Sequence, residues 1–304
     1  MSNLVEKARL AVLKKMKFLP PERYVGYYFQ YYTGKKYHDD HPVEFYEKIQ
    51  WYKAHYHPPI LNRLVDKYAV REYVREKIGA QYLNDCIAVY DSPWKVDFDA
   101  LPDRFVLKGV HGYGYNLIVS DKSKLNRTKA RYKLCKWFLR NQYYRGGLEW
   151  AYKDIKPRFV AEKYLEELER DSITDYKFYC FSGKPKFLEV HLDRSSGGHR
   201  SGYFTLDFEP APYNDVPPEK AIRTPPPKPE NFEEMKQLAE KLADRFPFVR
   251  VDFYSIRGKT IFGEMTFYPS DGRCDFYPQQ YNRTIGDLFV LPRLSKGEKT
   301  ITVY

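Results

Sequence analysis

The first eighty residues carry apolar side chains at helical spacing. In PVEFYEKIQWYKAHY, Phe45, Ile49 and Tyr52 recur three or four positions apart, which is typical of one buried helix face. The segment LNRLVDKYAVREYVREKIG indicates one further helix, which Gly79 ends. We therefore predict that residues 1–80 are mainly helical.

The middle of the chain changes to short apolar runs. Residues 105–108 and 117–119 lie on either side of a glycine-rich turn, and they predict a β-hairpin. Residues 126–141 are polar and helix-prone. The strand pattern then returns in four segments, which are RFVAEKYL, DYKFYCFSG, KPKFLEVHLD and SGYFTLDF.

The last third adds a helix and a second hairpin. Residues 208–229 are rich in proline and predict a long irregular connection. After it, FEEMKQLAEKLADRF places its apolar residues on one helix face. The segments FVRVDFY and TIFGEMTF predict two strands joined by a turn at residues 255–259. Helices followed by hairpins indicate an α+β protein.

Charge and composition narrow the class of partner. The chain of 304 residues has a net charge of +11, which favours an anionic partner. The basic residues are interleaved with 40 acids and form no long block, so we expect no dedicated nucleic-acid role. The four cysteines form no CxxC pair, which fits a reducing cytoplasm better than a disulfide framework.

The N-terminal segment MSNLVEKARLAVLKKMKF predicts a basic amphipathic helix. Charges interrupt its apolar stretch, so it does not match a secretory signal. Two interpretations stay open, a docked structural helix and a peripheral contact with the inner face of a membrane. The apolar residues expected on one face are Leu4, Val5, Ala8, Ala11 and Val12.

The turn in RFVLKGVHGYGYNLIV carries the first chemical signal. Gly109, Gly112 and Gly114 allow backbone N–H groups to approach an anion, and Lys108 ends the preceding strand. The turn runs into a strand, so it is not the dinucleotide-binding turn that opens a helix. A phosphate site and an ordinary glycine-rich hairpin both fit this stretch.

Two carboxylates in the C-terminal hairpin carry the second signal. Asp252 and Glu264 each lie among strand-forming apolar residues, and a turn at 256–259 would bring them together. Facing carboxylates repel each other, and Mg²⁺ between them would remove that cost. The alternative is that Arg250 and Lys259 neutralise them as salt bridges.

Five motifs in order resemble the teichuronopeptide-biosynthesis (TupA-like) ATP-grasp family of bacterial polysaccharide loci. They are VDKYAVREYV, FVLKGVHGYGYN, AEKYL, DYKFYCFSG and VRVDFY with GEMTFYP, and the resemblance covers about residues 40–295. It implies an ATP-grasp fold, in which two α+β subdomains grip ATP. The expected parts are a helical region at 1–80, a first subdomain with the glycine-rich loop at 81–165, and a second subdomain with the metal-binding hairpin at 166–304.

The resemblance implies a role for each matching position. Lys67 and Lys108 would hold the phosphates of ATP, and the loop formed by Gly112, Tyr113 and Gly114 would fold over them. His111 and Asn116 flank that loop. Contacts to adenine, ribose or phosphate would come from strand residues, which are Glu162, Lys163, Leu165, Asp175 and Lys177.

The resemblance also implies metal ligands and catalytic groups. Asp252, Glu264 and Thr266 would bind Mg²⁺, although ATP-grasp enzymes usually have Asn where this chain has Thr266, which weakens the case for a second ion. Arg194 would clamp the transferred phosphate or the acceptor carboxylate, and Lys108 and Lys177 would share in catalysis.

The function implied is an ATP-dependent carboxylate–amine ligase. It would join an amino acid or small amine to a uronic acid or a similar carboxylate in cytoplasmic steps of surface-polysaccharide synthesis. The resemblance is also compatible with a homodimer. A glycosyltransferase, an ATP-grasp phosphotransferase and a nucleotide-binding scaffold remain the alternatives. No DxD motif of a glycosyltransferase lies next to a suitable strand. The nearest lookalikes are Asp39-Asp40 and Asp97-Phe98-Asp99, and the latter fits a turn before the strand that carries Lys108.

Overall fold

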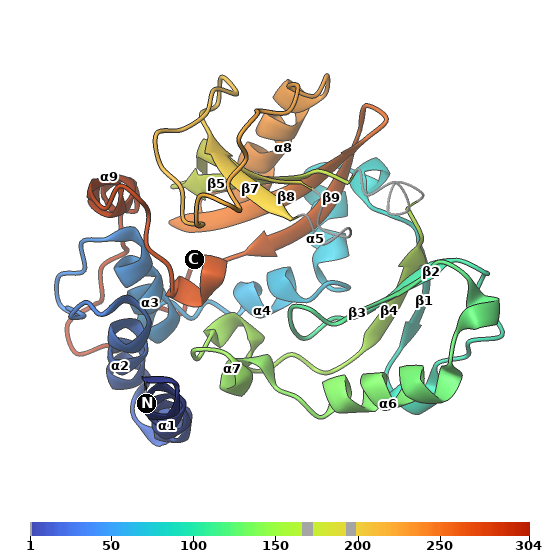
Figure 1. Cartoon of the computed structure of the whole chain (residues 1–304), viewed down its shortest axis with the longest axis horizontal. Helices are drawn as coiled ribbons and strands as arrows, with labels where there is room; N and C mark the ends of the chain where they lie inside the picture. The colour runs from blue at the N-terminus through green and yellow to red at the C-terminus, as the bar shows by residue number, and fades with distance from the viewer. Residues whose placement is uncertain (1, 166–172, 193–198) are drawn as a thin grey trace.

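The structure, a computed structural model, describes residues 2–165, 173–192 and 199–304 (Figure 1). In these residues, five α-helices precede the first strand, the remaining helices alternate with or follow the strands, and the strands form two antiparallel sheets. The main helices are α1 (Ser2–Lys15), α2 (Pro21–Thr33), α3 (Phe45–His55), α4 (Ile60–Val65), α5 (Val70–Lys77), α6 (Arg127–Phe138), α7 (Gln142–Arg145), α8 (Phe232–Ala243) and α9 (Gln280–Leu288). The strands are β1 (Cys86–Tyr90), β2 (Phe105–Gly109), β3 (Asn116–Val119), β4 (Phe159–Lys163), β5 (Asp175–Phe181), β6 (Lys184–Leu192), β7 (Arg200–Phe204), β8 (Phe248–Ile256) and β9 (Lys259–Thr266).

The first sheet has the strand order β1-β4-β2-β3. Its two faces alternate along each strand, as strand geometry requires. Phe105 and Leu107 point into a core that Leu134 and Trp137 of α6 complete. Val106 and Lys108, which alternate with them along the strand, point to the other face, where they line a cavity. The hairpin expected at residues 105–119 is confirmed, with Lys108 opposite Asn116.

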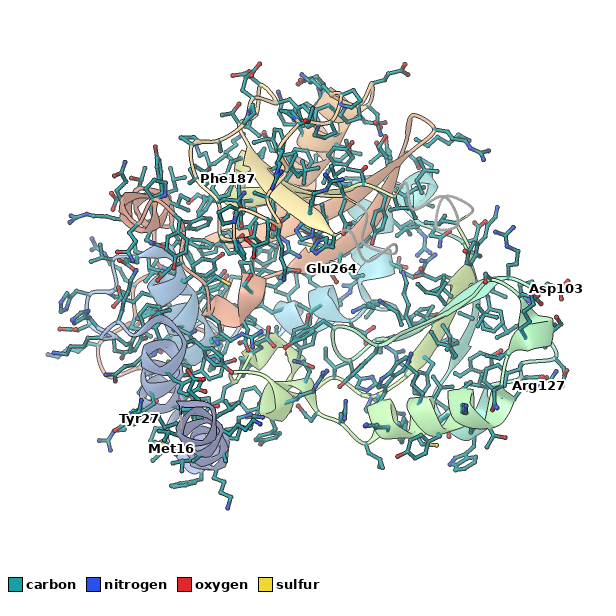
Figure 2. All side chains as sticks on the ribbon, viewed as in Figure 1. Met16, Tyr27, Asp103, Arg127, Phe187 and Glu264 are labelled. Atoms are coloured by element: carbon teal, nitrogen blue, oxygen red, sulfur yellow. The ribbon has the colours of Figure 1, made fainter. Side chains whose placement is uncertain are left out.

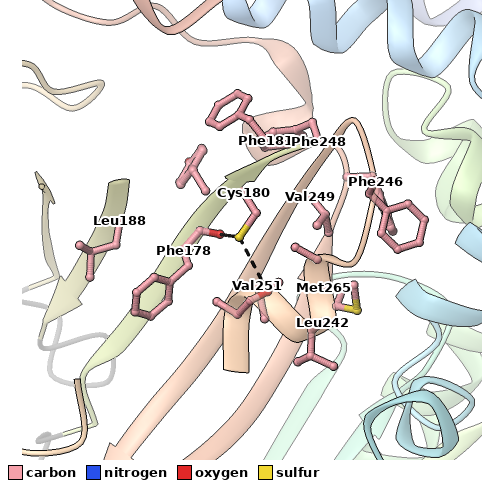
Figure 3. Packing of buried hydrophobic residues seen from close by; sticks show 14 of the residues in the cluster. Phe178, Cys180, Phe181, Leu188, Leu242, Phe246, Phe248, Val249, Val251 and Met265 are labelled. Atoms are coloured by element: carbon pink, nitrogen blue, oxygen red, sulfur yellow. Dashed lines mark hydrogen bonds between the residues drawn. The ribbon is translucent and has the colours of Figure 1, made fainter. Parts of the chain in front are cut away.

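The second sheet has the order β7-β6-β5-β8-β9, and α8 covers one of its faces. Figure 3 shows this packing, in which Phe178, Val251 and Leu242 belong to one buried cluster. Cys180 lies among them, and its thiol points to the carbonyls of Phe178 and Ala239 at 3.6 and 4.0 Å. The predicted amphipathic helix and the second hairpin are both confirmed.

The helix expected between residues 60 and 79 is two helices, so that prediction was wrong. Oδ1 of Asp66 accepts hydrogen bonds from the backbone N–H groups of Tyr68 and Ala69, at 2.8 and 2.9 Å. Such a side-chain bond starts a new helical turn and competes with continuation of the old helix. Lys67 consequently lies in the corner between α4 and α5 rather than inside a helix.

Helix α1 is confirmed, but the face that docks it is not the predicted one. Leu13 is buried against Tyr24 and Tyr143. Val5 and Val12 are exposed, and so is Phe18, at 82%. None of the described helices has both the length and the apolar character needed to cross a membrane.

A buried ion pair ties the separate parts together. Lys53 of α3 and Asp271, in the turn η7 (Pro269–Gly272) after β9, are 1% and 4% exposed, and their charged atoms lie 2.8 Å apart. Asp271 also accepts from Tyr28 of α2 at 2.5 Å and from the backbone N–H of Gly147 at 3.0 Å. One carboxylate thus links the N-terminal helices, the segment before β4 and the strand pair β8–β9.

A second buried acid, Glu149, lies beside this pair. Its carboxylate accepts a hydrogen bond from Gln142 at 3.3 Å. Burial and then the neighbouring charge of Asp271 raise the pKa of Glu149 to about 8. Glu149 is therefore mainly protonated at neutral pH, which avoids two like charges in one buried cluster.

We predict that Lys53→Met lowers the free energy of unfolding by about 3–5 kcal/mol, because it leaves the Asp271 carboxylate buried without its cation. Urea unfolding followed by circular dichroism measures the change. The matched control is Lys241→Met at an exposed position of α8, which should change stability by about 0.5 kcal/mol or less. Equal losses in the two variants would contradict the structural role of the pair.

We predict that Glu149→Gln changes how stability depends on pH. The folded state holds a proton on Glu149 up to about pH 8, whereas the unfolded chain loses it near the ordinary value of 4.5. The wild type should therefore lose stability relative to Glu149→Gln as pH rises between these values, by at most about 1.4 kcal/mol per pH unit. Urea unfolding at several pH values measures the difference, and parallel pH profiles would refute a proton on Glu149.

Candidate active site

Two adjoining cavities lie between the sheets. One has a volume of about 290 Å³ and the other about 200 Å³, and together they form one cleft. Glu264 lies between the two sheets in Figure 2, on the wall that the second sheet supplies. Five residues line both cavities, which are Asn84, Lys108, Asn116, Glu162 and Tyr254.

The larger cavity has apolar walls and a polar rim. Val106, Ile118 and Leu165 supply apolar surface, and Lys163 and Asp175 supply polar groups. A slot of this kind suits a flat heteroaromatic base. The backbone N–H of Lys163 already donates to the carbonyl of Asp85, at 3.0 Å. A base would therefore have the Lys163 carbonyl, which accepts from Asn84 at 2.9 Å but has a second lone pair, and the backbone of Leu165.

The smaller cavity gathers three lysines from three different elements. Lys108 of β2 lies 2.7 Å from Glu162 of β4. Lys177 of β5 lies 2.5 Å from Asp252 of β8, and Lys67 comes from the corner between α4 and α5. Burial lowers the pKa of the Lys67 ammonium and Lys108 adds to this, while Glu264 opposes it. Converging cations are the chemistry that binds a polyphosphate.

The position of Lys67 follows from the broken helix. Arg158 pairs with the other carboxylate oxygen of Asp66 at 2.9 Å, so the corner is fixed from two sides. Lys67 then reaches the glycine-rich turn and donates to the carbonyl of Gly112 at 2.8 Å. The helix break therefore brings this lysine to the loop.

The glycine-rich turn is close-packed, and its tip lies at the smaller cavity. A Cβ on Gly112 would lie only 2.7 Å from the ring of Tyr115, and Gly114 has a φ of +73°. Tyr113 and Gly114 line the cavity. His111 is buried and its Nε2 donates to the Trp137 carbonyl at 2.9 Å. This contact anchors the loop to α6 and directs the imidazole away from the cleft, so the expected reach of His111 to phosphate finds no support here.

Asp252 and Glu264 face each other, as the hairpin pattern predicts. Arg250 binds both oxygens of Asp252, at 2.7 and 2.8 Å, and lies 3.4 Å from Glu264 and 3.3 Å from the hydroxyl of Thr266. The neutralisation by Arg250 weighed above therefore occurs, whereas Lys259 lies at the far end of the strand, opposite Ile256. Burial alone would raise the pKa of Glu264, but Lys67, Lys177 and Arg250 outweigh it and lower that pKa.

This donor set fits a Mg²⁺ ion that a phosphate ligand also holds. Mg²⁺ takes one or two carboxylates and completes its shell with phosphate and water oxygens. Two facing carboxylates line the polar cavity beside the lysines. In the described part of the chain, no three His, Cys, Asp or Glu side chains converge as a full metal-ligand set. The phosphate oxygens would therefore have to complete the coordination.

Sequence reasoning missed three polar residues that line the cleft. Arg71 lies 3.9 Å from Glu162. It comes four residues after Lys67, and this helical spacing could have indicated that the two side chains share one side of the cleft. Asn84 lies in an irregular segment with no pattern to identify it. Tyr254 lies two positions after Asp252 on the same strand, where alternation could have shown that it shares the face. Arg194 lies outside the described residues.

Comparison with known proteins relates this cleft to characterised folds. The profile of the TupA-like ATP-grasp family matches residues 47–290. A search of curated proteins gave no match. Among solved structures, D-alanine–D-alanine ligase from Bacillus anthracis with ATP has 16% identity and a TM-score of 0.38, covering 68% of this chain and 55% of that one.

Two further solved structures resemble the chain. The Helicobacter pylori D-alanine–D-alanine ligase has 13% identity and a TM-score of 0.43, covering 77% of this chain and 60% of that one. A D-cycloserine synthetase has 14% identity and a TM-score of 0.39, with coverage of 76% and 72%. The chain thus spans little more than half of the length of the Bacillus anthracis ligase.

The family match covers both sheets, the glycine-rich loop and the carboxylate hairpin. The resemblance noted in the sequence is therefore confirmed, and the two-sheet cleft is that of an ATP-grasp fold. The chain belongs to the TupA-like ATP-grasp family.

Proposed function

We propose that the protein is an ATP-dependent carboxylate–amine ligase that forms an amide through an acyl phosphate. The observation that carries the proposal is the meeting of Lys67, Lys108 and Lys177 with Asp252 and Glu264 in one cleft. Family membership supports it, because ATP-grasp enzymes use ATP between two such subdomains.

In this proposal the adenine lies in the larger cavity and the triphosphate in the smaller one. Lys108 and Asn116 line both cavities, so they would stand at the junction of base and phosphates. Asp175 lies at the same junction, 3.2 Å from Lys177, and would face the ribose. Tyr113 and Gly114 would close over the terminal phosphates.

Asp252 and Glu264 would hold Mg²⁺, with Thr266 nearby. The ion would draw negative charge from the phosphate oxygens and orient them. Arg250 and Lys177 now neutralise the carboxylates, and both would turn toward the developing charge of the transferred phosphoryl group. Arg194 would clamp the transferred phosphate or the acceptor carboxylate.

The reaction needs positioning and charge neutralisation rather than a protein nucleophile. An oxygen of the acceptor carboxylate attacks the γ-phosphorus, and the bond to the β-phosphate oxygen breaks to release ADP. The amine then attacks the carbonyl carbon of the acyl phosphate, phosphate leaves, and the nitrogen loses its proton. Lys108 and Lys177 would stabilise negative charge in the first step.

We propose a uronic acid or similar sugar carboxylate as acceptor, and an amino acid or small amine as nucleophile, in surface-polysaccharide synthesis. The occurrence of the TupA-like family in bacterial polysaccharide loci supports an acidic glycan substrate, and so does the net charge of +11. We further propose a cytoplasmic site of action, with α1 and Phe18 in peripheral contact with the inner membrane face. The exposure of Val5, Val12 and Phe18 beside lysines supports this contact.

Thermal unfolding with nucleotide tests the site. We expect Mg²⁺ with ATP or ADP to raise the melting temperature, since ligand at 100 times its dissociation constant adds about 2.7 kcal/mol to the free energy of unfolding. Glu264→Gln should remove the Mg²⁺-dependent part of that rise. The control Glu240→Gln alters an exposed residue of α8 that pairs with Lys184, and should keep it. A rise with UDP-sugars but not with ATP or ADP would contradict the proposal in favour of a glycosyltransferase.

Substrate-dependent ADP release tests the reaction. We expect rapid ADP release only when a uronate and an amine are both present, because the acyl phosphate must form and then be consumed. Lys177→Met should reduce the rate about ten- to a hundredfold, as one charge-assisted contact contributes about 1.5–3 kcal/mol. A coupled ADP assay and mass spectrometry of the amide measure the outcome. ADP release with a carboxylate or hydroxyl acceptor alone would support a phosphotransferase instead.

A further inference from the structure

The tip of the glycine-rich loop has a second neighbourhood besides the nucleotide cleft. In Figure 1 the β2–β3 hairpin points toward α7 and the turn that follows β9. Tyr113, at that tip, is 37% exposed. Its neighbours on this side come from α7 and from the turn after β9, and none of them has one of the ATP-binding roles described above; they are Gln142, Arg145, Asp271 and Arg273.

Arg145, at the end of α7, is exposed and lies against the loop. Its guanidinium carbon is 5.7 Å from the ring centre of Tyr113 and 5.5 Å from that of Tyr115. Its side-chain hydrogen bond goes to the neutral amide of Gln142, at 3.5 Å. The positive charge of Arg145 is thus held by two rings and an amide rather than by a carboxylate.

Arg273 presents a second guanidinium on the same side. Its side chain is 37% exposed and lies 5.2 Å from the ring centre of Tyr32. Its Nε donates to the Ser270 carbonyl at 3.3 Å and is 3.9 Å from Asp271. That carboxylate has closer partners, because Lys53 lies at 2.8 Å and Tyr28 at 2.5 Å.

The charges of this region do not cancel. Lys53 neutralises Asp271, and Glu149 keeps its proton at neutral pH because burial raises its pKa to about 8. Burial, Glu149 and Asp271 raise the pKa of Tyr113 to about 12, and Arg273 opposes them, which places Tyr113 within the electrostatic reach of all three groups. The two arginines near the loop tip therefore leave a net positive surface next to the place where the terminal phosphates would lie.

We propose that Arg145 and Arg273 form the acceptor subsite, and that they bind the anionic group of a sugar placed beside Tyr113. This inference rests on the proposed ligase function, and it names the residues that would select an acidic sugar. Guanidinium groups suit this task because each can donate two parallel hydrogen bonds to a carboxylate or a phosphate. The rings of Tyr32 and Tyr113 would supply flat surface and hydroxyl groups for the sugar.

The simpler explanation is that Arg145 only holds the loop tip through its cation–π contact. That explanation predicts a different result, because the same loop lies at the nucleotide cavity. Loss of a loop support would weaken nucleotide and sugar binding together. Loss of an acceptor contact would weaken only the binding of the anionic sugar.

The test is equilibrium binding of sugars to the full chain in the presence of Mg²⁺ and a non-hydrolysable ATP analogue. Titration calorimetry would use glucuronate, glucose 1-phosphate and glucose as probes. The variants are Arg145→Gln and Arg273→Gln, with Arg145→Lys and Arg273→Lys in reserve should either fail to fold. The control is Arg127→Gln, which removes an exposed arginine of α6 that pairs with Asp99.

We expect the wild type to bind a charged sugar more tightly than glucose, and each Gln variant to weaken that binding about ten- to a hundredfold. The dissociation constant of ADP should stay within about twofold, and Arg127→Gln should match the wild type. Stronger binding of glucuronate than of glucose 1-phosphate identifies the carboxylate as the group bound, and the reverse order identifies a sugar phosphate.

Three results would each contradict the proposed subsite. They are unchanged sugar binding in both variants, an equal weakening of ADP binding and sugar binding, and no binding of either charged sugar by the wild type. These readouts need no turnover. Arginine-dependent sugar binding without amide formation would therefore leave the subsite standing while the ligase proposal falls. Where ADP release occurs, the variants should raise the KM for the uronate and leave the KM for ATP unchanged.

Discussion

The need to neutralise buried charge in the second sheet constrains the whole cleft. Lys177 and Asp252 are almost fully buried, and their charged atoms lie 2.5 Å apart. Neither could be buried alone, since an isolated ion in the interior is far costlier than a paired one. Register places Lys177 opposite Asp252 and Asp252 opposite Glu264, so the cross-strand pairing that builds the sheet also aligns the charges. The other face of the same strands is apolar and packs on α8, which holds the charged row in place (Figure 3).

The second constraint is how the cleft walls are held relative to the N-terminal helices. Asp271 follows the carboxylate strand β9 and is bound by Lys53 and Tyr28 from α3 and α2. Its bond from Gly147 reaches the segment that precedes β4 of the other sheet. A Cβ on Gly147 would lie 2.6 Å from the Tyr28 ring and 2.8 Å from Asp271, so only glycine allows this approach. The contacts around Asp271 thus connect both walls of the cleft and support the surface that carries Arg145 and Arg273.

Local patterns in the sequence predicted every described strand except β1 (Cys86–Tyr90), as well as α8 and the facing of Asp252 and Glu264, because alternation and turn chemistry are short-range properties. The same reasoning missed the break at Asp66, where a capping side chain overrides an otherwise helical pattern. It also gave His111 a place in the cleft, although the imidazole reaches the Trp137 carbonyl on a helix 26 residues further along the chain. Contacts between distant segments, such as Lys53 with Asp271, have no short-range pattern and emerge only from the fold.

The pairs seen in the cleft also bear on how it would work. The carboxylates of Glu162 and Asp252 lie next to Lys108 and Lys177. They occupy the positions that phosphate oxygens would take. In the proposed binding mode a polyphosphate would therefore replace existing ion pairs rather than meet bare cations, and only the difference between the two sets would contribute to affinity. Asp252 and Glu162 would then lose their lysine partners, although Arg250 still binds both oxygens of Asp252. Mg²⁺ can serve Asp252, and Arg71, already 3.9 Å from Glu162, can serve the other. In this arrangement nucleotide and metal binding would be coupled, because Mg²⁺ would replace the positive charge that Lys177 withdraws from Asp252.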